Sequence, residues 1–265
     1  MRPALLECDA GAWCRASSSS MSVEIIAHRG ASFDAPENTL ASIQLGWKQG
    51  ADAVEIDVQF SKDGHIVVIH DDTTRKTAGV RRKVGAQTLV ELRQLDVGRW
   101  KSAKWAGERI PTLAEAIATI PDGKRLFVEI KCGAVCFPQF VKTFRASGKT
   151  SQQVVPIGFS LDTMRQLKQA LPELEICLIS DFKRTLRGWS PTAEKLITLA
   201  KEAGLDGIDV SGKGPIDAVF AQKVHEDGLT LYIWTVDSPA LARKLAAAGV
   251  DGITTNKPGW LRTKM

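Results

Sequence analysis

Short apolar segments alternate with helical segments along most of this chain, and polar residues follow many of the apolar segments. Alternation of this kind predicts parallel strands joined by right-handed helical crossovers. Strands are predicted over about 23–28, 51–58, 125–130, 154–159, 174–180, 207–210, 229–236 and 252–255, and helices over 39–50, 112–120, 137–147, 161–171, 191–203, 215–227 and 238–248. About eight such units close into a (β/α)8 TIM barrel, whose active site lies at the C-terminal ends of the strands.

An open doubly wound sheet is the alternative fold. It is disfavoured because no glycine-rich dinucleotide-binding turn follows the first strand. In addition, polar residues lie at the ends of many strands and not only at one switch point in the strand order. The rhythm is interrupted only between the second and third barrel strands. There the turn Ser61–Gly64 leads to an apolar run, His65–Ile69, and we interpret the polar segment over about 73–110 as an insertion.

Length and charge are consistent with one enzyme-sized domain. The 265 residues match a barrel of about 250 residues, and 44% hydrophobic residues supply a large core. The net charge of +5 is dispersed, and the basic clusters Arg81–Lys83 and Lys183–Arg184 lack interleaved aromatic residues, so no nucleic-acid binding is expected. No run of about 18 apolar residues is present, so no stable membrane insertion is expected either.

Residues 1–20 lack the apolar core of a secretory signal, and Met21 directly precedes the first strand. We expect 1–20 to be a disordered leader or an extension, with a single domain over 21–265. The cysteines are odd in number and too sparse for a disulfide framework. They are Cys8, Cys14, Cys132, Cys136 and Cys177. Free thiols in a reducing compartment, and hence a cytoplasmic protein, are the prediction.

Acidic side chains end two neighbouring barrel strands. Glu55 and Asp57 share one face of the second strand because successive side chains alternate, and Glu129 ends the third. Three converging carboxylates would repel one another and raise their pKa values. A divalent cation relieves this, and oxygen-only ligation favours Mg²⁺ or Ca²⁺ over zinc. The alternative is a structural polar layer in which Lys131 pairs with Glu55 and Asp57.

Basic and aromatic side chains reach the same end of the barrel. Arg29 and Lys131 would hold a phosphodiester. His28 and His70 would serve as general acid and base on opposite sides of phosphorus, although a lone His28 is equally compatible with a structural role. Trp234, at the end of the seventh strand, is a candidate to line the pocket.

Together these motifs resemble the glycerophosphodiester phosphodiesterases over about 23–259. The resemblance is carried by His28-Arg29-Gly30, Pro36-Glu37-Asn38-Thr39, Glu55-Ile56-Asp57-Val58, Asp63-Gly64, His70-Asp71, Ile110-Pro111-Thr112-Leu113, Glu129-Ile130-Lys131, Trp234-Thr235-Val236 and Asp251-Gly252-Ile253-Thr254-Thr255-Asn256. The chain departs from the family after His70-Asp71. A Leu-Asp-Arg-Thr stretch is usual there, whereas this sequence reads Asp72-Thr73-Thr74-Arg75-Lys76-Thr77.

The resemblance implies a TIM barrel with a small insertion, about 59–110, between the second strand and its helix. It also implies one Mg²⁺ or Ca²⁺ ion on Glu55, Asp57 and Glu129, with His28 and His70 as the acid/base pair. Arg29 and Lys131 would bind the phosphate, and Asn38 would support the site.

The implied reaction is hydrolysis of a small glycerophosphodiester to sn-glycerol 3-phosphate and an alcohol, and a homodimer is compatible with it. The alternatives are a lyase of the phospholipase D or C type that forms a cyclic phosphate, and a non-catalytic binding protein on the same barrel.

Overall fold

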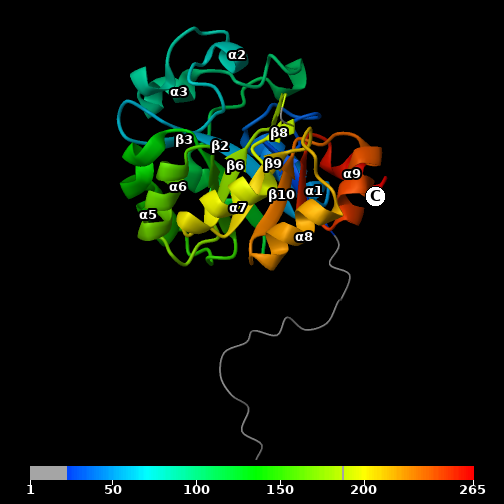
Figure 1. The fold of residues 1–265 in the computed structure, drawn as a ribbon. Helices are drawn as coiled ribbons and strands as arrows, with labels where there is room; N and C mark the ends of the chain where they lie inside the picture. The colour runs from blue at the N-terminus through cyan, green and yellow to red at the C-terminus, as the bar shows by residue number, and fades with distance from the viewer. Residues whose placement is uncertain (1–22, 187) are drawn as a thin grey trace, which may run out of the picture.

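The computed structural model describes residues 23–186 and 188–265, in which eight parallel strands form a closed barrel with helices packed around it (Figure 1). The barrel strands are β1 (Glu24–His28), β2 (Ala53–Phe60), β4 (Arg125–Ile130), β5 (Val154–Gly158), β6 (Cys177–Ser180), β9 (Gly207–Ser211), β10 (Thr230–Trp234) and β11 (Gly252–Thr255). They pair in the order β1-β11-β10-β9-β6-β5-β4-β2, and β1 pairs with β2 to close the ring. The predicted (β/α)8 fold is confirmed, whereas the predicted leader over 1–20 lies outside the described residues.

Side-chain hydrogen bonds cap the start of most helices around the barrel. The helices around the barrel are α1 (Leu40–Lys48), α4 (Leu113–Ala118), α5 (Phe137–Ala146), α6 (Leu161–Ala170), α7 (Ala193–Glu202), α8 (Ala218–Glu226), α9 (Pro239–Ala248) and α10 (Pro258–Arg262). Thr112 accepts a hydrogen bond from the Glu115 backbone N–H, and the Glu115 carboxylate accepts one from Thr112 N–H, as the spacing predicts. The short α10 was not predicted.

Apolar side chains pack on both faces of the barrel wall. Outward-facing residues such as Ile56 and Val128 form one large core with the helices, including the fully buried Phe140 of α5. Inside the barrel, Phe127 and Tyr232 meet edge to face with ring centroids 4.9 Å apart. The hydroxyl group of Tyr232 also joins a hydrogen-bonded network with the side chains of Arg125 and Glu175. The filled lower barrel leaves the C-terminal strand ends as the place for a site.

Between β2 and α4 the chain forms a separate small layer, at the top of Figure 1. It contains β3 (Ile66–Val68), α2 (Arg75–Ala78), η1 (Val84–Ala86), α3 (Leu89–Gln94) and η2 (Ala103–Trp105), and β3 pairs antiparallel with β2. Its own core includes Val67, Leu92 and Ile110. Where the sequence departs from the family pattern, Thr74 donates a 2.8 Å hydrogen bond to the Val80 carbonyl and so closes the loop internally.

Two further features differ from expectation. Cys132 and Cys136 form a disulfide, so the prediction of free thiols is wrong for this pair; a 3₁₀ turn over Gly133–Cys136 brings their Cα atoms to 6.1 Å. Cys177 is a free, buried thiol. A hairpin of β7 (Lys183–Thr185) and β8 (Gly188–Ser190) also lies unpredicted between β6 and α7. Within the described residues, no helix has the length and apolarity needed to cross a bilayer.

Truncation of Phe140 tests the outer core. We expect Phe140→Ala to lower the free energy of unfolding by about 3–5 kcal/mol, because the ring is fully buried and the gap can close only in part. Val219→Ala, at a side chain 60% exposed on α8, is the control and should change it by less than about 0.5 kcal/mol. Urea unfolding followed by circular dichroism measures both, and equal effects would contradict this account of the core.

Candidate active site

The predicted site residues converge at the C-terminal ends of the barrel strands. A cavity of about 270 Å³ opens there. It is lined by His28, Arg29, Glu55, His70, Glu129, Lys131, Ile157, Phe159, Ile179, Asp209, Trp234, Thr235 and Thr254. Asp57 and Asn38 are buried beside it and are joined by a hydrogen bond. All nine side chains singled out from the sequence therefore gather in one place.

Strand register brings three carboxylates together. Asp57 of β2 lies opposite Glu129 of β4, and Glu55 stands two residues before Asp57 on the same face. One ligand oxygen from each of the three lies within 4.8 Å of the others. Glu55 and Asp57 are almost completely buried. An oxygen-only cluster of this kind could hold a hard divalent cation.

The electrostatic surroundings shift the pKa values of the three carboxyl groups in different directions. Burial, together with the charges of Asp57 and Glu129, raises the pKa of Glu55 well above its usual range. Burial and the charge of Asp57 raise the pKa of Glu129 to about 7. Burial also acts to raise the pKa of Asp57, but Arg29 and other neighbouring cations outweigh it and lower that pKa. The cluster thus concentrates negative charge on Asp57 while its neighbours resist ionisation.

Asp57 itself has one unsatisfied oxygen. Its Oδ2 accepts a 2.8 Å hydrogen bond from Asn38 Nδ2 and lies 3.2 Å from Arg29 Nε. Its buried Oδ1 makes no hydrogen bond and has only ion-pair contacts, with Lys131 Nζ at 3.4 Å and His70 Nε2 at 4.0 Å. Buried acceptors are rarely left without a hydrogen-bond partner. The free oxygen suits a metal ligand, so this donor set fits a cation.

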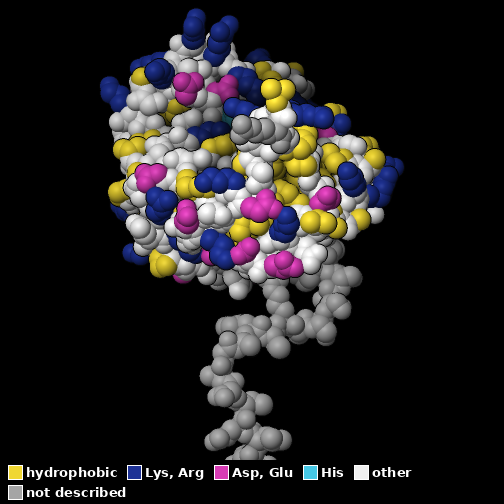
Figure 2. Space-filling model, in the orientation of Figure 1, with side chains coloured by type: hydrophobic (Ala, Val, Ile, Leu, Met, Phe, Trp, Pro, Cys, Tyr) yellow, Lys and Arg dark blue, Asp and Glu magenta, His cyan; other side chains and the backbone are white. Residues whose placement is uncertain are grey.

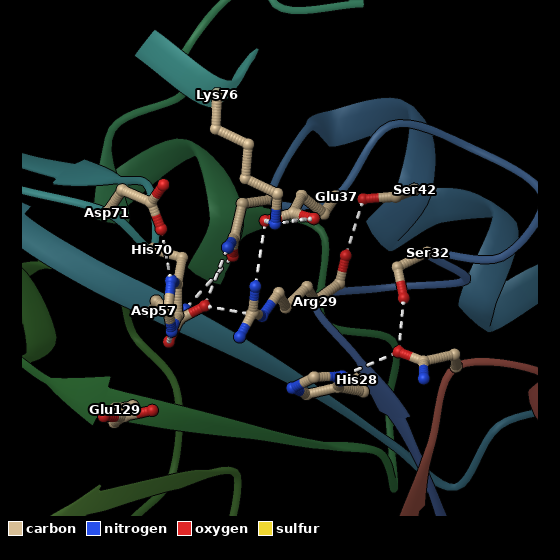
Figure 3. Close-up of polar contacts among 12 residues, drawn as sticks. His28, Arg29, Ser32, Glu37, Ser42, Asp57, His70, Asp71, Lys76 and Glu129 are labelled. Carbon is tan, nitrogen blue, oxygen red and sulfur yellow. Dashed lines mark hydrogen bonds and ion pairs between the residues drawn. The ribbon is translucent and has the colours of Figure 1, made fainter. Parts of the chain in front are cut away.

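Arg29 is held by its backbone as well as by its guanidinium. Its φ of +55° is left-handed, and its N–H donates a 2.9 Å hydrogen bond to Glu55 Oε2. The guanidinium pairs with Glu37 at 2.9 Å, and Glu37 also binds Lys76 of α2 at 2.7 Å (Figure 3). A left-handed residue without glycine's freedom is strained, which is common at functional sites. The insertion therefore helps to position the arginine.

His28 is oriented by a neutral amide. Its Nδ1 lies 2.7 Å from Asn256 Oδ1, while Asn256 Nδ2 donates to Asp237 at 2.7 Å. Since the Asn256 oxygen can only accept, His28 carries its proton on Nδ1, and Nε2 faces Glu55 at 4.0 Å. Burial and the charge of Arg29 lower the pKa of His28. It therefore presents a neutral imidazole with a free lone pair.

His70 is oriented by a carboxylate. Its Nδ1 lies 2.6 Å from Asp71 Oδ1, and its Nε2 is 4.0 Å from Asp57 Oδ1 (Figure 3). The two remaining histidines lie elsewhere: His65 is exposed beside Asp63, and His225 on α8 binds Asp251. Only His28 and His70 among the four bring a ring nitrogen to the carboxylate cluster.

Comparison with known proteins agrees with this geometry. The model of the glycerophosphoryl diester phosphodiesterase family matches residues 28–260. The chain belongs to this family. A glycerophosphodiester phosphodiesterase of Caldanaerobacter subterraneus subsp. tengcongensis is 35% identical over 90% of this chain and 96% of its own. An Oleispira antarctica phosphodiesterase, solved with the product sn-glycerol-3-phosphate, superposes with a TM-score of 0.82 at 28% identity, covering 92% and 97% of the two chains.

The structure adds residues that carry no role in the sequence-based account of this family member. Asn256 and Asp237 orient His28, and Asp71 orients His70. Asn256 and Asp71 belong to motifs noted in the sequence, but their contacts with His28 and His70 were not predicted. Asp209 is also new: it is a buried carboxyl in the middle of β9 that faces the cavity. A charged residue within a short apolar strand was the one available signal.

The turn after His28 offers a test of the site's backbone. Gly30 has φ +78°, and a Cβ there would lie 2.4 Å from the Ser42 carbonyl carbon. We expect Gly30→Ala to abolish most activity, because the turn must shift Arg29. Gly79→Ala is the matched control: φ is +72°, but a Cβ meets nothing within 4 Å, so only strain of about 1–2 kcal/mol applies. Turnover and the melting temperature are measured for both variants. Equal losses of turnover in Gly30→Ala and Gly79→Ala would refute the steric argument.

Proposed function

We propose that this enzyme hydrolyses glycerophosphodiesters to sn-glycerol 3-phosphate and an alcohol, using a divalent cation and two histidines. The observation that carries the proposal is the pair of imidazole Nε2 atoms, His28 and His70, each 4.0 Å from a carboxylate of the acidic cluster. Two histidines flanking a cation site and two basic side chains provide the groups that phosphodiester cleavage needs. The product bound in the Oleispira antarctica relative supports the same chemistry.

Glu55, Asp57 and Glu129 would hold the cation. When bound, it would polarise a phosphoryl oxygen and offset the negative charge that grows on the phosphate. Nothing in the donor set distinguishes Mg²⁺ from Ca²⁺, since both prefer carboxylate oxygens. Lys131 Nζ lies between two of these acids, 2.7 Å from Glu129 and 3.4 Å from Asp57.

Arg29 and Lys131 would bind the phosphate oxygens. Both line the cavity and border the acidic cluster, and Asn38 fixes Asp57 from behind. The guanidinium supplies paired donors, whereas the ammonium acts as a point charge. Lys and Arg side chains are also frequent over the upper part of the face in Figure 2, where the insertion lies, and such charge attracts an anionic diester.

The two histidines would divide the proton transfers. His28, neutral and with its lone pair toward the cavity, would take the proton of the attacking group. His70, held in place by its 2.6 Å contact with Asp71, would give a proton to the leaving alkoxide. Trp234 lines the cavity and would exclude water from its side.

Removal of either histidine tests this assignment. We expect His28→Ala and His70→Ala each to lower kcat for glycerophosphocholine by about 10²–10⁴-fold, the usual contribution of one acid or base. His65→Ala, at an exposed position beside Asp63, is the control and should keep wild-type turnover. Full activity in either folded site variant, or a cyclic phosphate as the final product, would overturn the proposal.

Cation binding can be measured apart from turnover. After EDTA treatment, adding Mg²⁺ or Ca²⁺ should restore activity and raise the melting temperature, since a ligand at 100 times its Kd stabilises by about 2.7 kcal/mol. Glu129→Gln should reduce that thermal shift strongly. Glu91→Gln, in the exposed pair with Arg82, should leave it intact. An EDTA-treated enzyme with undiminished turnover would contradict the metal requirement.

A further inference from the structure

Asp209 is a buried carboxyl group that the proposed mechanism does not use. It lies in β9, is only 3% exposed and lines the same cavity as the acidic cluster. Its Oδ1 is buried and makes no hydrogen bond. Burying a carboxyl oxygen without a partner destabilises a fold, so such a group is a candidate for a ligand contact.

The position of Asp209 separates it from the metal site. In the strand order of the barrel, β11 and β10 lie between β9 and β1 on one side, and β6 and β5 lie between β9 and β4 on the other. Asp209 is therefore on the opposite wall from Glu55 and Asp57. Among the described residues, the cluster with ligand atoms within 4.8 Å contains three carboxylates and not this one.

The surroundings of Asp209 suit an uncharged polar ligand. Burial, followed by the charge of Glu129, raises the pKa of Asp209 to about 8, and no described cation pairs with it. A neutral carboxyl offers both a donor and an acceptor, as an alcohol hydroxyl requires. Ile157 and Ile179 supply apolar wall beside it.

Trp234 and Phe159 shape the same subsite. Trp234 Nε1 donates a 3.2 Å hydrogen bond to the backbone carbonyl of Asp209, which fixes the indole against β9. Phe159 meets Trp234 edge to face, with centroids 5.9 Å apart, and is 53% exposed at the rim. The enclosed end of this wall thus fits a short carbon chain bearing a hydroxyl, and the open end leaves room for a variable group.

We propose that Asp209 hydrogen-bonds the terminal hydroxyl of the substrate's glycerol moiety and so selects glycerol-bearing diesters. The inference rests on the proposed function, which puts the phosphate between Arg29 and Lys131. From there the three-carbon chain crosses the cavity toward β9. Its terminal hydroxyl, the farthest from phosphorus, then reaches Asp209, while the middle hydroxyl stays beside the phosphate.

Two substrates that differ by one hydroxyl test the contact. One is the 4-nitrophenyl diester of glycerol 3-phosphate. The other is its propane-1,2-diol counterpart, which keeps the middle hydroxyl and lacks the terminal one. We expect the wild-type enzyme to prefer the first in kcat/KM by roughly tenfold to a hundredfold, the usual effect of one buried hydrogen bond.

Variants at Asp209 should change this ratio in a defined order. Asp209→Leu keeps the branched shape of the side chain, with bulkier methyl groups, and removes the hydrogen bond, so the ratio should fall toward one. Asp209→Asn keeps a neutral donor and acceptor and should retain most of the preference. Ser211→Ala, two residues along β9 and equally buried, is the matched control and should leave the ratio unchanged.

The outcomes separate this inference from the function it rests on. A wild-type ratio in folded Asp209→Leu, or an equal fall in Ser211→Ala, would refute the role of Asp209. A ratio in Asp209→Asn as low as in Asp209→Leu would also refute it, because the neutral hydrogen bond would then be irrelevant. A wild-type enzyme that cleaves neither diester would instead refute the proposed function.

Discussion

Repulsion among three closely spaced carboxyl groups, two of them buried, is the constraint around which the C-terminal end of this barrel is built. Glu55, Asp57 and Glu129 could not share so small a volume without positive charge nearby. Arg29 and Lys131 supply part of that charge, and both have raised pKa values because the carboxylates outweigh the effect of burial. The arrangement is costly as a structural element. It becomes favourable if the site binds a cation and a phosphate together, as we propose.

The barrel wall supplies the precision that this charge cluster needs. Parallel register sets Asp57 opposite Glu129 and His28 opposite Glu55, so these four groups are held by strand pairing and not by a loop. Outside the strands, fixed contacts take over: Asn256 holds His28, and Glu37 holds Arg29. Rigid support of this kind is what electrostatic stabilisation of a transition state requires.

Much of this design is readable in the sequence because it is local. Strand ends carry their own polar residues, so the barrel, the acidic cluster and the two histidines followed from periodicity and position. Other features depend on which distant segments meet. The contacts of His28 with Asn256, 228 positions away, and the location of Asp209 across the cavity arise only when the ring closes. The Cys132–Cys136 disulfide depended on a local 3₁₀ turn that the cysteine spacing alone did not specify.

The two histidines belong to different parts of the fold, and this division has a consequence for how such an enzyme could arise. His28 comes from a barrel strand, whereas His70 follows β3 in the layer between β2 and α4. A barrel without that layer would keep His28, the three acids, Arg29 and Lys131, and could capture a phosphate. It would lack His70, to which we assign the second proton transfer. On this proposal the layer supplies the group that turns capture of a phosphate into cleavage, and its docking decides whether a bound diester is cleaved or merely held.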